Sequence, residues 1–132
     1  MSRFYLDTSV AVHAVLFEGR AARWLDAITS SSDHAVLSSR LLQTELTRVL
    51  RREGRPVSER EPLLGHITFI PLTDAVLTAA EAITEHVKTL DAIHLASAVS
   101  LGSSVVVVSH DANMLRLAEA FGLQTIDPVV QS

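Results

Sequence analysis

The clearest pattern in the chain is a run of four valines at 105–108 that leads, after two residues, into Asp111. Consecutive β-branched residues predict a strand that is buried on both faces. The N-terminal residues 4–6 have the same layout, because they form a short apolar run that leads into Asp7. Both segments therefore predict a buried strand with an aspartate at its carboxyl end.

The rest of the chain alternates between short apolar runs and segments with apolar residues at helical spacing, separated by Gly and Pro. These patterns predict strands at 3–7, 35–38, 67–72, 105–108 and 124–127, and helices at 8–16, 20–30, 40–53, 73–86, 91–101 and 112–121. A weaker helical patch is expected at 62–65, and the polar segment 55–61 is expected to be exposed. Because strands alternate with helices, the expected fold is α/β, with a central, mostly parallel β-sheet flanked by helices on both faces (α/β/α).

Length and composition narrow the class of protein. A chain of 132 residues fits a single domain spanning 1–132. It contains no cysteine, which excludes disulfides and thiolate metal sites and fits a reducing cytoplasm. No stretch approaches the roughly 20 apolar residues of a membrane span, so no membrane association is expected. The net charge of −4 argues against a general nucleic-acid coat, although six of the 11 Lys and Arg residues lie between positions 40 and 60.

Four acidic residues carry the candidate chemistry. Asp7 and Asp111 end strands, Asp91 opens the Ala-rich helix, and Glu45 lies one turn into the helix at 40–53. Each also has a structural explanation, since the three aspartates stand where helix N-caps are wanted and Glu45 could pair with a nearby arginine. A cap needs only an acceptor, however, and Glu45 borders the apolar stripe of its helix. The pattern therefore favours convergence at one edge of the sheet, where parallel α/β folds bind ligands.

Convergence of these carboxylates would require a cation. Two carboxylates about 4 Å apart repel by roughly 4 kcal/mol at an effective dielectric constant near 20. Oxygen ligands without Cys or paired His favour a hard ion, Mg²⁺ or Mn²⁺, over zinc. Such an ion activates water and polarises a phosphoryl oxygen, so the expected reaction is phosphodiester hydrolysis.

Four segments in this order resemble a PIN domain, and more narrowly the VapC-type ribonuclease toxins of bacterial toxin–antitoxin pairs. They are Tyr5-Leu6-Asp7-Thr8-Ser9, Gln43-Thr44-Glu45-Leu46, Thr89-Leu90-Asp91-Ala92-Ile93-His94-Leu95-Ala96 and Val107-Val108-Ser109-His110-Asp111. The resemblance spans nearly the whole chain. It implies a metal-dependent endoribonuclease of the PIN fold that forms a homodimer and is inhibited by a cognate VapB-like antitoxin.

The resemblance also implies site residues. Asp7, Glu45, Asp91 and Asp111 would form the metal site, with Ser9 and Ser109 beside it. Asp7 and Asp91 are the expected direct ligands, while Asp111 and Glu45 would complete the site or hold water, and Glu45 would orient the nucleophile. Ser109 stands where the family often has Thr, and the family's basic residue before the third acid is represented only by Lys88.

Residues around the four acids are assigned as follows. Arg48 and Arg52 lie on the same side of their helix as Glu45 and are expected to contact RNA phosphates, the alternative being a solvated charged face. His94 is expected to pack between helices, and His110 to face away from the acids. Trp24 is expected in the core or at a dimer interface.

Three other functions compete with the ribonuclease hypothesis. A phosphotransfer receiver or haloacid-dehalogenase-like phosphatase would also place Asp7 at a strand end. Such a site requires a lysine after a strand, however, and the only lysine in the sequence is Lys88, at the end of a predicted helix. A non-catalytic PIN scaffold is opposed by the presence of all four acids. A DNA nuclease of the same fold stays open, because metal–carboxylate chemistry does not itself read the 2′-OH.

Overall fold

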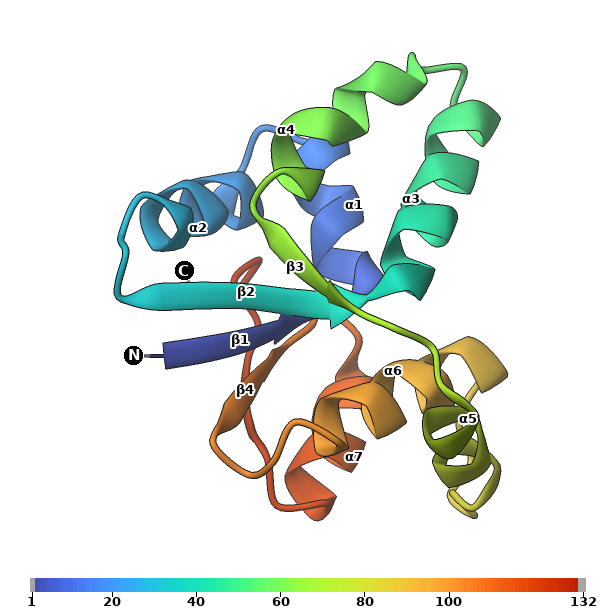
Figure 1. Ribbon diagram of the computed structural model, residues 1–132. Helices are drawn as coiled ribbons and strands as arrows, with labels where there is room; N and C mark the ends of the chain where they lie inside the picture. The colour runs from blue at the N-terminus through green and yellow to red at the C-terminus, as the bar shows by residue number, and fades with distance from the viewer. Residues whose placement is uncertain (1, 131–132) are drawn as a thin grey trace.

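The computed structural model describes residues 2–130 and contains one parallel β-sheet (Figure 1). Its strands follow the order β3-β2-β1-β4-β5, and every neighbouring pair is parallel. The bounds are Ser2–Leu6 (β1), His34–Ser39 (β2), Ile67–Ile70 (β3), Val105–Val108 (β4) and Gln124–Ile126 (β5). The predicted fold class is confirmed. The strand order changes direction between β1 and β4, which is where parallel sheets open a crevice at their carboxyl ends.

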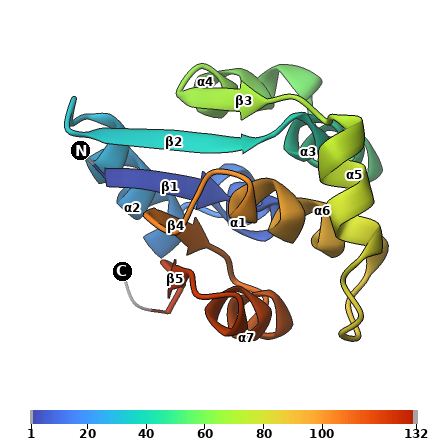
Figure 2. The same cartoon turned by 60° about the horizontal axis from the view of Figure 1, so that its bottom comes forward.

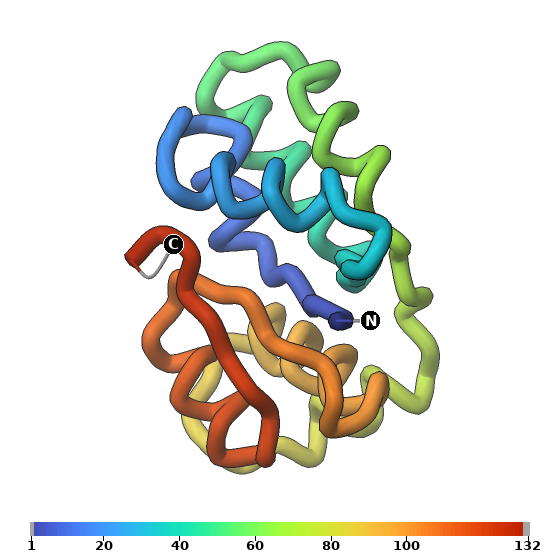
Figure 3. Tube along the Cα trace, turned by 90° about the vertical axis from the view of Figure 1, so that its left-hand side faces the viewer, coloured from blue at the N-terminus to red at the C-terminus, as the bar shows by residue number. Residues whose placement is uncertain are grey.

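Helices cover both faces of the sheet. They are α1 (Thr8–Leu16), α2 (Arg20–Thr29), α3 (Arg40–Arg52), the 3₁₀ turn η1 (Val57–Arg60), α4 (Glu61–Leu64), α5 (Asp74–Glu81), α6 (Thr89–Val99) and α7 (Ala112–Ala120). Helices α1 to α4 lie on one face, and α5 to α7 lie on the other (Figures 1 and 2). Figure 3 shows the same division along the chain, with β1 between the two layers. None of the helices described is long and apolar enough to cross a membrane.

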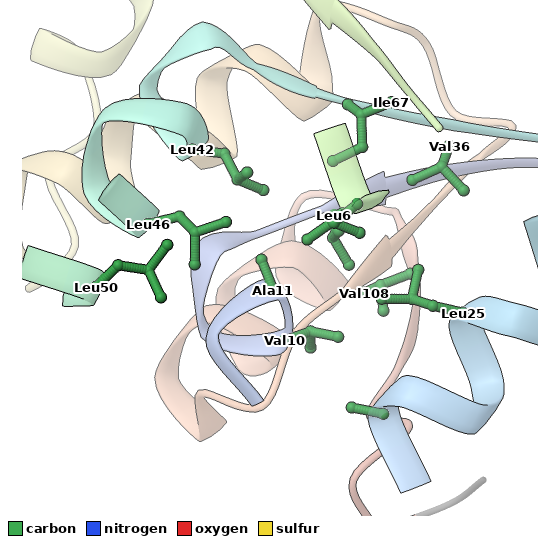
Figure 4. Close-up of a cluster of buried hydrophobic side chains, with 12 residues drawn as sticks. Leu6, Val10, Ala11, Leu25, Val36, Leu42, Leu46, Leu50, Ile67 and Val108 are labelled. Atoms are coloured by element: carbon green, nitrogen blue, oxygen red, sulfur yellow. The ribbon is translucent and has the colours of Figure 1, made fainter. Parts of the chain in front are cut away.

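Alternation along the strands builds a separate core on each face of the sheet. Successive strand residues point to opposite faces, so Tyr5 packs into one cluster and Leu6 into the other. On the α1–α4 face, Leu6 meets Leu42, Leu46 and Leu50, which are all fully buried on one stripe of α3 (Figure 4). This packing fixes the rotation of α3, and with it the direction in which the neighbouring Glu45 projects.

The start of α6 differs from the prediction. The helix begins at Thr89 rather than Asp91, and Lys88 occupies the N-cap position without a side-chain hydrogen bond to the helix. Asp91 is therefore the third residue of the helix and does not cap it. Its carboxylate lies in the first turn, where its charge favours the helix dipole, but N-capping does not explain it.

Two further segments differ from the prediction. Helix α5 ends at Glu81 instead of near residue 86, because Val76 is its only buried residue and 84–86 are all exposed. Segment 55–61 is not simply an exposed polar loop. It contains η1, and Arg55 forms a two-pronged ion pair with Glu59 that holds this turn.

Candidate functional site

The register of β1 and β4 brings two predicted site residues together. Leu6 pairs with Val108, so Asp7 and Ser109 follow their strands side by side. The Asp7 amide donates to the Val108 carbonyl at 3.0 Å, and the Ser109 hydroxyl donates to Asp7 Oδ2 at 2.5 Å. This contact joins the starts of α1 and α7, which Asp7 and Asp111 respectively cap.

Asp7 is a buried carboxylate with hydrogen bonds to both oxygens. Its side chain caps the N-terminus of α1, because Oδ1 accepts hydrogen bonds from the Ser9 amide at 3.0 Å and from the Val10 amide at 3.5 Å. The Ser9 hydroxyl also donates to Oδ1, at 2.5 Å. Burial raises the pKa of Asp7 even though the Ser109 and Ser9 hydrogen bonds act to lower it. Both serines predicted beside the site thus contact this one carboxylate.

Ser109 also connects Asp7 to Asp111. While its hydroxyl donates to Asp7, it accepts a hydrogen bond from the Asp111 amide at 3.0 Å. The Asp111 carboxylate itself caps α7 by accepting from the Met114 amide at 3.0 Å. A single buried hydroxyl therefore fixes the spacing between two of the candidate ligands.

Glu45 is held by two side chains that sequence reasoning did not assign to the site. Its Oε1 accepts from the Thr8 hydroxyl at 2.6 Å and lies 2.8 Å from His94 Nε2. On its other side, His94 Nδ1 lies 2.7 Å from the Tyr5 hydroxyl. Because an ionised carboxylate only accepts hydrogen bonds, Nε2 is the donor to Glu45, and Nδ1 shares a hydrogen bond with the Tyr5 hydroxyl. Burial opposes ionisation of Glu45, but hydrogen bonds from His94 and Thr8 lower its pKa.

His94 does pack between secondary-structure elements, as predicted, and only 1% of its surface is exposed. The prediction missed that this packing places the ring between Tyr5 and Glu45. One signal was present in the sequence, since His94 lies three residues after Asp91 and so projects from a neighbouring side of α6.

Asp91 is close enough to the other acids to be affected by their charge. It is half-buried, and its pKa is raised first by burial, then by the charges of Asp111 and Asp7, and to a smaller extent by Glu45. The charges of the three other predicted acids thus all act on Asp91. In the part of the chain described, no three acidic or histidine side chains are grouped closely enough to hold a metal ion as they stand.

The remaining assigned residues lie around this centre. His110 turns to Asp127, with 2.9 Å between Nδ1 and Oδ2, and its ring packs on His13. Arg52 is exposed and lies 4.0 Å from a Glu53 carboxylate oxygen. Trp24 packs edge to face on Phe4, with ring centroids 5.1 Å apart, in the core on the α1–α4 face.

Comparisons with known proteins agree with this architecture. The family model for the PIN domain matches residues 4–120. Ribonuclease VapC35 of Mycobacterium tuberculosis is 30% identical over 132 residues, covering 94% of this chain and 96% of that protein. Ribonuclease VapC46 of the same species is 29% identical over 133 residues, covering 97% of this chain and 99% of that protein.

Solved structures show the same fold at lower identity. The VapBC2 complex of Rickettsia felis, bound to a promoter DNA fragment, superposes with a TM-score of 0.74 at 12% identity and covers 94% of this chain and 97% of the matched chain. A toxin–antitoxin complex from Klebsiella pneumoniae superposes with a TM-score of 0.66 at 19% identity, covering 97% and 98% of the two chains.

Proposed function

This chain belongs to the PIN domain family, and we propose that it is an endoribonuclease of the VapC type, inhibited by a cognate VapB-like antitoxin. Its relatives over nearly the full length are named ribonucleases, which supports RNA as the substrate. The likeness to chains from toxin–antitoxin complexes extends over more than nine-tenths of this chain and supports the antitoxin as partner. That the protein forms a homodimer stays a prediction, which light scattering on the purified protein would test.

One observation supports the proposal: Asp91 lies near enough to the three other predicted acids, which come from separate segments, to be affected by their charges. The charges of Asp111, Asp7 and Glu45 all act to raise the pKa of Asp91. Carboxylates that repel one another in this way destabilise the protein unless protons or a cation offset their charge. A nuclease that uses a divalent ion requires such an arrangement, whereas N-capping accounts for Asp7 and Asp111 alone.

We propose that the ion is Mg²⁺ or Mn²⁺, because the available ligands are carboxylate oxygens. Asp7 and Asp91 would hold it directly, and Asp111 and Glu45 would complete the site or bind it through water, in keeping with the several waters that Mg²⁺ usually retains. When bound, the ion would lower the pKa of a water molecule and offset charge on the phosphoryl group.

The protein's own side chains would position the reacting groups. Ser9 and Ser109 hold the two oxygens of Asp7, so this carboxylate cannot rotate away from the site. Thr8 and His94 hold Glu45 through Oε1 and keep it ionised. We assign Glu45 to orienting the attacking water, since its second oxygen accepts no hydrogen bond among the described residues.

Arg48 and Arg52 are the proposed RNA-phosphate contacts on the neighbouring helix face. Together with Arg51 they line one shallow hollow on the surface of α3. Guanidinium groups bind phosphate oxygens through paired hydrogen bonds, which supports this assignment.

Cleavage of RNA by the purified protein tests the proposed activity. We expect cleavage with Mg²⁺ or Mn²⁺, none with EDTA, and no cleavage of a single-stranded DNA of the same sequence. Expression alone should arrest growth, and co-expression with the small open reading frame adjacent to the gene should relieve the arrest. Normal growth together with intact RNA would instead favour a binding scaffold, and cleavage of the DNA would favour a DNA nuclease.

Metal binding should also be visible as a change in stability. The pKa values of Asp7 and Asp91 are raised above the ordinary value of 3.8. At a pH between 3.8 and these raised values, the folded protein therefore holds protons that the unfolded chain has lost. Stability of the metal-free protein should therefore fall as pH rises from about 4 through the raised pKa values of the folded state. At neutral pH, Mg²⁺ at 100 times its Kd should add about 2.7 kcal/mol to the free energy of unfolding.

Asp91→Asn separates this electrostatic effect from ordinary stabilisation. Removing one repelling carboxylate should raise the melting temperature of the metal-free protein at neutral pH and abolish most of the Mg²⁺-dependent increase. Asp33→Asn is the matched control, because this exposed aspartate lies in the loop before β2, at the opposite edge of the sheet. Differential scanning fluorimetry with and without Mg²⁺ measures both effects. A metal-free Asp91→Asn protein that melts lower than the wild type would contradict the proposed repulsion.

A further inference from the structure

A second polar hollow lies on α3 and shares Arg48 with the first. Its volume is about 220 Å³, and each of its lining side chains can donate a hydrogen bond: Arg40, Gln43, Thr44, Thr47, Arg48 and Arg60. No carboxylate is among these side chains. We call this hollow the arginine cup. Its chemistry suits an anion that can accept several hydrogen bonds at once.

Two of the three arginines of the cup are held in place by threonines of α3. Arg40 donates to the Thr44 hydroxyl at 3.2 Å, and Arg60 donates to the Thr47 hydroxyl at 2.6 Å. Arg60 comes from η1, so two separate segments supply the guanidinium groups that surround Arg48. Such fixed donors lose less conformational entropy on binding an anion than freely rotating side chains do.

The positive charge of the cup is only partly neutralised within the protein. Among the ion pairs of residues 2–130, the pair between Arg60 and Glu61, at 3.2 Å, is the one that involves the cup. Glu61 is itself exposed and lies outside the lining. Arg40 and Arg48 form no ion pair in this part of the chain. A bound anion would therefore find unpaired guanidinium groups.

The position of Arg40 also favours an anion. It is the first residue of α3, at the positive end of the helix dipole, and the first turn contains no acidic residue. A cation there opposes the dipole and is unfavourable unless a negative charge lies nearby. Arg40 also directly follows the carboxyl end of β2, the edge of the sheet at which Asp7 follows β1.

We propose that the arginine cup binds a backbone phosphate of the RNA strand whose scissile bond lies at the carboxylates. This inference rests on the proposed ribonuclease function. Arg48 lies three residues after Glu45 and so projects from a neighbouring side of α3, which makes it the part of the cup nearest to Glu45 on the helix surface, whereas Gln43 and Thr47 project from the opposite side. A strand that enters the acidic site can then place a neighbouring phosphate among the guanidinium groups. The acids disfavour the RNA by charge repulsion, and the cup offsets this effect.

The salt dependence of RNA affinity tests the proposal. Fluorescence anisotropy with a labelled single-stranded oligoribonucleotide, in EDTA to prevent cleavage, gives Kd over a range of NaCl concentrations. The double variant Arg40→Gln/Arg60→Gln, which leaves the Arg48 contact proposed above in place, should bind more weakly and flatten the log–log slope by about 0.7, the value for one phosphate on a single strand. Thr47→Val, which removes the hydroxyl that holds Arg60, should weaken binding in the same direction. Arg23→Gln changes the charge equally on the exposed face of α2 and should match the wild type.

Each result decides for or against the cup. An unchanged slope in the double variant overturns it, as does a wild-type protein that fails to bind the oligoribonucleotide. A second experiment titrates the protein with inorganic phosphate. If phosphate binding depends on the arginines but the salt slope for RNA is unchanged in the double variant, the cup is a site for free anions and the proposal is overturned. Metal-activated cleavage of the same RNA is measured separately. If the wild-type protein cleaves the RNA but the double variant has an unchanged salt slope, only the cup is refuted. If the salt slope changes in the double variant but the wild-type protein does not cleave, only the ribonuclease function is refuted.

Discussion

Asp7→Asn is expected to reduce RNA cleavage by at least about 100-fold, because it removes a carboxylate that binds the ion and even residues behind metal ligands typically matter 10- to 100-fold. The fold should survive. Asn is as good an N-cap as Asp, so α1 keeps an acceptor for the Ser9 amide. The Ser109 hydroxyl can rotate to accept from the new amide group in place of donating to Oδ2.

Initial rates of cleavage at saturating metal measure this loss. Circular dichroism and melting temperature check the fold, and RNA affinity in EDTA should be equal to or tighter than that of the wild type because one negative charge is gone. Asp33→Asn is again the control for a change of one charge. Wild-type cleavage rates in a preparation free of contaminating nuclease would remove Asp7 from the site and contradict the proposed chemistry.

His94→Leu should reduce cleavage by about 10- to 100-fold, although His94 is not itself assigned to the reaction. The substitution removes the Nε2 contact that fixes Glu45 and lowers its pKa. It also leaves the buried Tyr5 hydroxyl without its imidazole partner, which should cost about 1–3 kcal/mol of stability. The activity loss should appear in kcat and in the apparent metal affinity.

Two matched variants separate positioning from packing in this cluster. His94→Gln places an amide donor toward Glu45 and should recover much of the lost rate, while Tyr5→Phe keeps Glu45 in contact with His94 and should lower activity less than His94→Leu. All three are compared at a temperature well below their melting points. If His94→Gln and His94→Leu lose equal activity, the hydrogen bond to Glu45 does not explain the effect.

Local patterns in the sequence determined most of the fold. The valine run at 105–108 does form a strand buried on both faces, and Val105 and Val108 belong to the cores on opposite faces. Asp7 and Asp111 follow strands as predicted, because a strand, its cap and the next helix are set by neighbouring residues. Element ends were less accurate where few apolar contacts fix them, as at α5.

Only the tertiary structure decided how the site is held. Asp91 lost its capping explanation because α6 begins two residues earlier than the pattern indicated. The contacts of Glu45 with Thr8 and His94 join residues 37 and 49 positions apart, and the approach of Arg60 to Thr47 depends on how η1 folds back on α3. Periodicity reports which face of an element is buried. It does not report which side chain from another element meets that face, since this depends on the packing of the whole chain.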